Sequence, residues 1–433
     1  MSTVAEEVRA PVDSPAPPRA PSAWTARAWW LAGLALVIVL PLLPGASSDF
    51  GRSLLTQMAI AVVFALSFNL LFGQTGLLSF GHAVYFGLGA YAAIHGMRAI
   101  NQGLLLPVVL VPLIGALGGL LSGAAFGAVT TRRAGTIFAL ISLGMGELVY
   151  AVTFMLPRVF GGEEGISASR TRATLNLGLK LASQLEVYYV VLAWTIIAGA
   201  LMYAFTRTPV GRMCNAVRDN PERAEFVGYR AQGVRFVAFA IAGTFAGLAG
   251  GLHAVNYEIV AADAVGAARS GAVLIMAYIG GAAHFAGPIL GAVTITWLQT
   301  SLSSYTSAWL LYLGIFFMLM ILYAPQGLIG LVLRHRELAG RSGAGGVLGA
   351  YAVAAIPVVV LLAGAIVLIE MSYRLSTQAE LGTRMRLLWM PIDAASPGPW
   401  VASLAAVIAG AALLRVVLRR VSAAWDRVGG RAP

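Results

Sequence analysis

The feature that most constrains the fold is a succession of apolar runs, each long enough to cross the hydrocarbon core of a bilayer, which is about 30 Å thick. Hydrophobic residues make up 59% of the 433 residues and charged residues only 11%, a composition that excludes a soluble globular domain. Ten runs are candidate spans: 28–43, 53–72, 79–97, 104–130, 134–156, 187–205, 236–256, 308–333, 347–369 and 399–418. We therefore predict an all-α polytopic membrane protein, since helices satisfy their own backbone hydrogen bonds in lipid.

A further apolar region, residues 270–302, is too long for one ordinary span and is interrupted at Gly280-Gly281 and Gly287-Pro288. It either crosses the membrane once or enters it and returns to the same side. Cytoplasmic loops collect arginine and lysine, and only the second alternative places the basic C-terminal tail on the same side as the arginine-rich interval 207–235. We therefore predict a re-entrant or broken helix pair, with both chain termini in the cytoplasm.

The interval 207–235, RTPVGRMCNAVRDNPERAEFVGYRAQGVR, is charged and lies between two apolar runs. Its six arginines would cost about 15–20 kcal/mol at a bilayer centre, at roughly 3 each, so the interval lies in water. Pro209 begins one short helix. Asn220 and Pro221 supply the N-cap and first residue of a second, which Gly228 ends. The sequence therefore predicts a compact helical elbow.

Several classes of function are excluded by residue usage. The net charge of +11 comes from arginines in short clusters beside apolar runs, which indicates membrane topology and not nucleic-acid binding. The single cysteine, Cys214, allows no disulfide framework, and His82 and His253 lack the spacing of metal ligands. The one lysine, Lys180, follows Leu179, so the chain has no phosphate-binding loop of the G-x4-G-K-[ST] type. We expect no catalytic residue, no metal and no cofactor on this chain.

Polar residues and glycines cluster in residues 69–91, NLLFGQTGLLSFGHAVYFGLGAY, inside an otherwise apolar region. Two interpretations stand. A glycine-broken helix at membrane depth would free backbone groups for a polar solute, as in many transporters, whereas the same residues also fit a tight cytoplasmic turn between two spans. Glu147 is the ionisable side chain well inside a span, where it either hydrogen-bonds a neighbouring helix or lines a solute path. The candidates for a solute path are Asn69, Gln74, Thr75, Ser79, His82, Tyr85 and Glu147.

Glycines recur every four residues in two of the predicted spans. They are Gly115, Gly119, Gly123 and Gly127 in one span and Gly243, Gly247 and Gly251 in the other. Such faces allow helix backbones to approach closely. Close packing within one subunit is the expected role, and a seam between subunits is the alternative.

The segment GQTGLLSFGHAVYFGLGAY resembles the signature of M-type permease subunits of branched-chain amino acid ABC transporters. Glu222-Arg223-Ala224, followed by Gly228, resembles the EAA-x3-G loop of ABC importers, with Arg223 where alanine is usual. Further matches in the same order fall at 135–147, 161–166, 246–250, 280–288 and 324–328, so the resemblance covers residues 50–330. It implies a type II-importer-like permease core over residues 28–335. Residues 1–27, rich in proline, are expected to be a disordered cytoplasmic tail, and residues 336–433 an extension with two further spans.

The resemblance also implies partners and a function. The loop would dock onto a cytoplasmic ABC ATPase, which would bind the ATP and magnesium. The residues expected to couple to it are Arg212, Arg218, Asn220, Pro221, Glu222, Arg223, Ala224 and Gly228. A second permease subunit and a periplasmic solute-binding protein are expected, the latter near Glu163 and Glu164, in a bacterial inner membrane.

The expected solute is a branched-chain or related small amino acid, with urea, amides and aromatic acids as alternatives within the same family. The rival from another class is an ion-coupled secondary transporter that uses Glu147.

Overall fold

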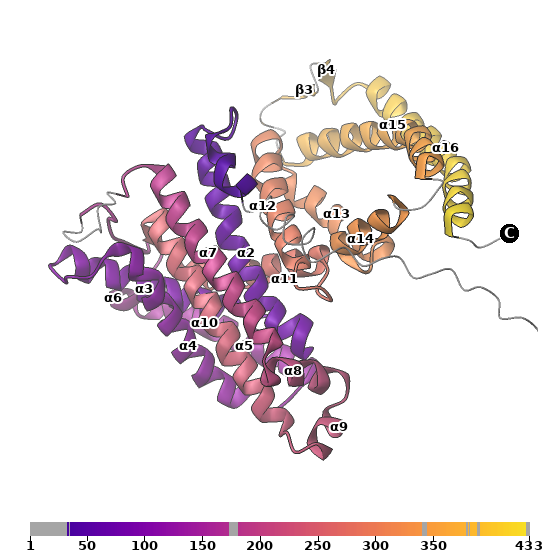
Figure 1. Ribbon diagram of the computed structural model, residues 1–433. Helices are drawn as coiled ribbons and strands as arrows, with labels where there is room; N and C mark the ends of the chain where they lie inside the picture. The colour runs from indigo at the N-terminus through magenta and orange to yellow at the C-terminus, as the bar shows by residue number, and fades with distance from the viewer. Residues whose placement is uncertain are drawn as a thin grey trace, which may run out of the picture. The chain divides into compact units, whose positions relative to one another are not determined.

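The computed structural model describes residues 33, 35–172, 181–339, 344–377, 380, 382–387 and 390–429. These residues are predominantly helical (Figure 1). The chain divides into two units, Met1–Arg52 and Ser53–Pro433. The contacts described below lie within the second unit, and the predicted tail 1–27 lies outside the described residues.

Along the described chain, most elements are helices and only a few are short strands. The first half contains η1 (Leu40–Leu42), α2 (Asp49–Thr75), α3 (Ala83–Asn101), η2 (Val108–Leu110), α4 (Val111–Thr130), α5 (Gly135–Met155), α6 (Pro157–Phe160), β1 (Ile166–Ser167), α7 (Gln184–Arg207), α8 (Pro209–Asp219) and α9 (Pro221–Phe226). The second half contains α10 (Ala231–Tyr257), β2 (Ile259–Val260), η3 (Ala262–Ala264), α11 (Ala267–Gly280), α12 (Gly287–Tyr305), α13 (Trp309–Tyr323), α14 (Gly327–Ala339), α15 (Ala344–Thr377), β3 (Arg384–Leu387), β4 (Met390–Asp393) and α16 (Pro397–Gly429).

Among the described residues, eight helices are long and apolar enough to cross a bilayer, or nine if the bent pair α13 and α14 counts as one span. This confirms the predicted all-α membrane fold. The run 79–97 is helical as α3, although α3 does not meet the same test of length and hydropathy. The run 28–43 lies partly outside the described residues.

The region 270–302 is broken where the glycines predict. Helix α11 ends at Gly280 and α12 begins at Gly287. The two helices fold back on each other, because a Cβ atom on Gly280 would clash with the carbonyl of Gly287, and one on Gly291 would clash with that of Met276. The broken helix pair is therefore confirmed, and its outer ends return to the same end of the helix bundle.

The run 308–333, expected to form one span, is divided into two helices. Helix α13 ends at Tyr323, α14 begins at Gly327, and their axes differ by 53°. Pro325 explains the break, because proline has no N–H to donate and disfavours helical geometry in the residue before it. Ala324 accordingly adopts φ −134° and ψ 65°.

The glycine faces of α4 and α10 pack against each other within the chain (Figure 1). A Cβ atom on Gly247 would lie 2.6 Å from the Cα of Gly119, and one on Gly251 would lie 2.8 Å from the Cα of Pro112. The two backbones are therefore in direct contact, and this seam belongs to one subunit. Helix α3 packs against the same pair.

The C-terminal extension forms a helical hairpin. Helices α15 and α16 pack against each other and are connected through the antiparallel pair β3 and β4, in which Arg384 pairs with Asp393. The hydroxyl of Tyr312 in α13 donates a 2.9 Å hydrogen bond to Glu370 in α15, so the hairpin is tied to the preceding helices by a polar contact.

We expect Gly247→Leu to destabilise the chain by about 1–3 kcal/mol or more, because a side chain at this contact must push two helix backbones apart. The measurement is thermal unfolding of the purified chain in lipid nanodiscs. Gly314→Leu in α13 is the matched control, since a Cβ atom there meets nothing within 4 Å. Equal melting temperatures for the two variants would contradict the packing described here.

Candidate functional site

The predicted elbow forms between α7 and α10. Thr208 caps α8, its hydroxyl accepting a hydrogen bond from the Gly211 N–H at 3.1 Å. Asn220 caps α9 through its side-chain oxygen, which accepts from the Arg223 N–H at 2.9 Å. Gly228 follows with φ +94°, in the left-handed region that favours glycine. The sequence prediction of two short helices, with Asn220 as the cap of the second, is confirmed, and the structure adds Thr208 as the cap of the first.

The elbow is held to α10 by a small apolar core of its own. Cys214, Val217 and Ala224 are buried, and they pack with three small or branched residues of α10, namely Ala231, Val234 and Ala238. Burial raises the pKa of the Cys214 thiol to about 12. Ala224 thus anchors α9, while most of the remaining elbow residues stay exposed.

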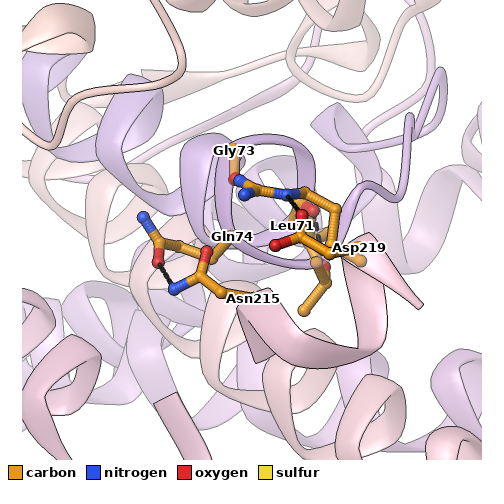
Figure 2. Close-up of polar contacts among 7 residues, drawn as sticks. Leu71, Gly73, Gln74, Asn215 and Asp219 are labelled. Carbon is orange, nitrogen blue, oxygen red and sulfur yellow. Dashed lines mark hydrogen bonds and ion pairs between the residues drawn. The ribbon is translucent and has the colours of Figure 1, made fainter. Parts of the chain in front are cut away.

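Polar contacts attach α8 to the end of α2. The side-chain amide of Asn215 donates a 2.9 Å hydrogen bond to the side-chain oxygen of Gln74, and the two side chains point toward each other in Figure 2. The guanidinium of Arg218 donates to the backbone carbonyl of Gly73 and pairs with Asp219 at 3.0 Å. The carbonyls at a helix C-terminus carry partial negative charge, so an arginine is favourable there.

The turn after α2 is shaped to receive Arg218. Gly76 has φ +69°, and a Cβ atom on it would lie 2.8 Å from Cγ of Arg218. The N–H of Gly76 donates to the carbonyl of Phe72, and the N–H of Leu77 donates to that of Leu71. A left-handed glycine that closes the last helical turn is a common helix ending. We call the set Gly73, Gln74, Gly76, Asn215 and Arg218 the elbow clamp.

The break between α11 and α12 meets the end of α2 at the clamp, and the break between α13 and α14 meets that same turn. A Cβ atom on Gly73 would clash with the carbonyl of Ala282, which lies in the turn between α11 and α12. In the same way, a Cβ atom on Gly327, at the start of α14, would lie 2.6 Å from the Cα of Gly281. The motifs at 69–91, 280–288 and 324–328 are therefore joined by close backbone contacts at one end of the helices, and the interval 207–235 is joined to them through the side chains of Asn215 and Arg218.

This arrangement separates the two interpretations of residues 69–91. Gln74 and Thr75 close α2 at the level of the water-facing elbow, so the chain turns there between two helices. The polar residues beyond the turn are enclosed: Asn69, Ser79, His82 and Tyr85 are at most 3% exposed. The turn is thus favoured over an open solute site at this break.

His82 lies in an aromatic enclosure. Its Nε2 is 3.0 Å from the hydroxyl of Ser67, which itself donates to the carbonyl of Phe64. The Ser67 oxygen is therefore the acceptor, and Nε2 carries the proton. The ring stacks on Phe64 at 5.5 Å and meets the edge of Phe68. Within the described residues, Nδ1 of His82 has no hydrogen-bond partner.

Glu147 lies on the exposed face of α5, together with Leu140 and Leu148, which are 67% and 60% exposed. No hydrogen bond or ion pair to its carboxylate is found in the part of the chain that the structure describes. The alternative in which Glu147 hydrogen-bonds a neighbouring helix of this chain is therefore not what the structure shows. A charged group exposed on a membrane helix would be unfavourable against lipid.

One cavity in the described part of the chain was not predicted from the sequence. It has a volume of about 630 Å³ and lies between α2, α3, α10, α11, α12 and α13. None of the seven predicted path residues lines it. Its polar lining includes Gln57, His253, Asp263, Arg269, Thr296, Gln299 and Thr300. The sequence carried one signal for it, because Thr296, Gln299 and Thr300 fall at i, i+3 and i+4 and so form one polar stripe on the apolar helix α12.

The tip of the elbow also carries two exposed apolar residues that were not among those predicted from the sequence. Phe226 is 91% exposed and Val227 is 70% exposed, at the end of α9 and directly before Gly228. Large apolar side chains of this exposure on a charged, water-facing segment are typical of a protein contact surface.

At the other end of the helices, the loop from Gly161 to Ile166 is pinned to the chain. Ile166 pairs with Val260 in the short β1 and β2 ladder, and a Cβ atom on Gly165 would clash with the Val260 carbonyl. Glu163 and Glu164 remain exposed on this fixed loop. The two acids are therefore presented on the side opposite the elbow.

Comparison with known proteins identifies similar chains. A sequence model of the family described as "Branched-chain amino acid transport system / permease component" matches residues 52–324. The high-affinity branched-chain amino acid transport system permease protein LivM of Salmonella typhimurium is 26% identical over 322 residues, covering 68% of this chain and 74% of that protein.

LivM of Escherichia coli is 26% identical over 300 residues, covering 63% of this chain and 68% of that protein. A probable LivH permease protein of Methanocaldococcus jannaschii is 23% identical over 303 residues, covering 65% and 94%. No solved structure matches the chain significantly.

The buried thiol gives a direct test of the clamp. Cys214 is the one cysteine in the sequence, and its raised pKa keeps the thiol protonated and unreactive well above neutral pH. We expect slow maleimide labelling of the folded chain at pH 8 and several-fold faster labelling in Arg218→Ala, whose α8 is detached from α2. Arg212→Ala, at an exposed position of the same helix, is the control and should label like the unaltered chain. Fast labelling of the unaltered chain would show that the elbow is not packed as described.

Proposed function

This chain belongs to the branched-chain amino acid transport system permease family, and from that membership we propose that it is the permease subunit of an ATP-driven importer. A separate cytoplasmic ATPase, holding ATP and magnesium, would dock on the elbow. The observation that carries the proposal is the exposed apolar tip, Phe226 and Val227, on an elbow that is clamped to the ends of the membrane helices.

The clamp explains how docking would reach the solute path. Helix α2, the pair α11 and α12, and α13 all line the cavity. The end of α2 contacts the elbow, the break between α11 and α12 adjoins that end, and the break after α13 adjoins the α11–α12 turn. Gln57 in the cavity lies on the order of 27 Å along α2 from Thr75, at 1.5 Å per residue. A partner that moves the elbow would therefore move one end of these helices, while their other parts line the cavity. Rigid-body movement of helices is a common way to pass a change from one site to another.

The direction of the chain in the membrane follows from its charges. The elbow carries six arginines, and α14 carries Arg334 and Arg336, which lie beyond the break at the same end. The positive-inside rule assigns this end to the cytoplasm of a bacterial inner membrane. The exposed Glu163 and Glu164 then face the periplasm, where we expect a solute-binding protein to dock.

A second permease subunit fits the exposed face of α5. Glu147 on this face would be costly against lipid, whereas a partner helix can supply a donor or a cation to it. Related permease proteins carry the names LivM and LivH in the same species, Escherichia coli and Salmonella typhimurium, which supports pairing of two different permease chains. We therefore propose a heterodimer that covers α5. An ion-coupled mechanism through Glu147 gains no support, because the residue lies on the surface and not in an enclosed site.

We propose a branched-chain or related small amino acid as the solute. The names of the similar permeases support this class over urea, amides and aromatic acids.

Phe226→Asp is expected to weaken association with the ATPase by about tenfold or more, because an exposed aromatic at an interface centre typically contributes 2 kcal/mol or more. Association is measured by co-purification and by the ATPase activity of the reconstituted complex. Tyr305→Asp is the matched control, since Tyr305 is 88% exposed at the end of α12 away from the elbow. If both variants retain the ATPase equally, Phe226 contacts something else and the docking proposal fails.

Glu147→Leu is expected to reduce the yield of the permease heterodimer several-fold while leaving the thermal stability of the isolated chain unchanged or raised. The reason is that leucine suits lipid but cannot pair with a polar group of the partner. Size-exclusion chromatography of the co-expressed subunits gives the yield. Glu147→Gln keeps the shape and the hydrogen-bonding capacity, so it should assemble better than Glu147→Leu; full assembly of the leucine variant argues against a partner at this face.

A further inference from the structure

The cavity between α2 and α10–α13 combines charge and apolar surface in a way that a small zwitterion would match. At about 630 Å³ it is within the usual range of small-molecule sites, about 300–1,000 Å³. Asp263 in η3 and Arg269 in α11 lie at its margin and form an ion pair of 3.2 Å. Both side chains belong to the cavity lining, so each sign of charge is presented to the same space.

The guanidinium of Arg269 has N–H groups that remain available as hydrogen-bond donors. The Cζ atom of its guanidinium lies over the Phe86 ring, 4.9 Å from the ring centre, in a cation–π contact. Asp263 is the one hydrogen-bonding partner of its side chain among the described residues, and it takes one of five N–H groups. Asp263 is itself largely exposed, with 73% of its side-chain surface accessible. A carboxylate can therefore bind Arg269 and an ammonium can bind Asp263 without dismantling buried structure.

A polar stripe faces the charged pair from α12. Thr296 is 8% exposed, and its hydroxyl is buried with no hydrogen-bond partner in the described part of the chain. Leaving a buried hydroxyl unpaired is unfavourable, and a solute that enters the cavity would supply the missing partner. Gln299 and Thr300, one turn further along, line the same cavity.

The rest of the wall is apolar. Ile60 and Phe64 of α2, Ile275 of α11, and Leu313 of α13 contribute to it. This surface would take an aliphatic side chain but offers little to a wholly polar solute.

We propose that this cavity is a solute station within the permease, in which Arg269 binds the carboxylate and Asp263 the ammonium of an α-amino acid whose apolar side chain lies against α2 and α13. The inference rests on the proposed import function, and it goes further by assigning the recognition to residues of this chain. It also distinguishes among solutes, because urea and amides carry no charge that the pair would bind.

The test uses the chain co-purified with its partner permease and ATPase, in nanodiscs, with calorimetry of three probes. These are L-leucine, isocaproate, which lacks the ammonium, and isoamylamine, which lacks the carboxylate. Arg269→Gln is expected to lower the affinity for leucine and isocaproate by about tenfold or more and to spare isoamylamine. Asp263→Asn is expected to weaken leucine and isoamylamine and to spare isocaproate.

Thr296→Val distinguishes a loss of leucine binding from a loss of folding. It preserves the shape of the side chain and removes only a hydroxyl with no partner, so the melting temperature should stay the same or rise while leucine affinity falls several-fold. Arg158→Gln, an exposed charge in α6 outside the cavity, is the control and should change neither.

The proposal is overturned if Arg269→Gln and Thr296→Val both bind leucine as tightly as the unaltered complex, or if the unaltered complex binds none of the probes. In both cases ATPase association through Phe226 would be unaffected, so the failure of this site is distinguishable from a failure of the import function.

Discussion

The contact between Arg218 and the end of α2 is the interaction on which the rest of this structure depends. A helix C-terminus has unpaired carbonyls, and at the end of α2 one of them, on Gly73, accepts from a guanidinium that belongs to the elbow. Asn215 adds a second, neutral hydrogen bond to Gln74. A segment that lies in water is thereby attached to the end of a membrane helix by two side-chain hydrogen bonds.

Glycine is the constraint that lets the other broken helices reach the same place. The turn between α11 and α12 approaches the end of α2 at Gly73, and the break between α13 and α14 approaches that turn at Gly281 and Gly327. A side chain at any of these three glycines would separate the backbones. Gly281 and Gly327 also have φ of +104° and +69°, so the same residues provide both the room and the conformation. The glycines of α4 and α10 do something different: they form a straight seam, with ordinary helical geometry, that joins two whole spans.

Features that depend on neighbouring residues were predictable from the sequence, and features that depend on packing were not. The caps at Thr208 and Asn220, the left-handed Gly228 and the break at Gly280–Gly287 all follow from residues within a few positions of one another. The cavity is different, because Asp263, Arg269 and Thr296 come from three elements, and no local pattern shows that they share a space. For Glu147, hydropathy shows that the residue lies in a span, but the face it occupies is decided by which side of α5 packs on the chain.

The elbow and the cavity lie toward opposite ends of the same helices. Helix α2, α11, α12 and α13 are each held at the elbow end by the clamp or by the glycine contacts that adjoin it, and each contributes lining residues further along. Close-packed helices transmit displacement poorly by bending, because their own hydrogen bonds resist it, and well by rotation as rigid pieces. The helices are interrupted at 281–286 and at 324–326; the first interruption contacts Gly73 of the clamp, and the second contacts Gly281. Under the proposed function, a displacement of the elbow would act on the end of α2 and on the neighbouring breaks, and Asp263 and Arg269 lie toward the opposite end of α11.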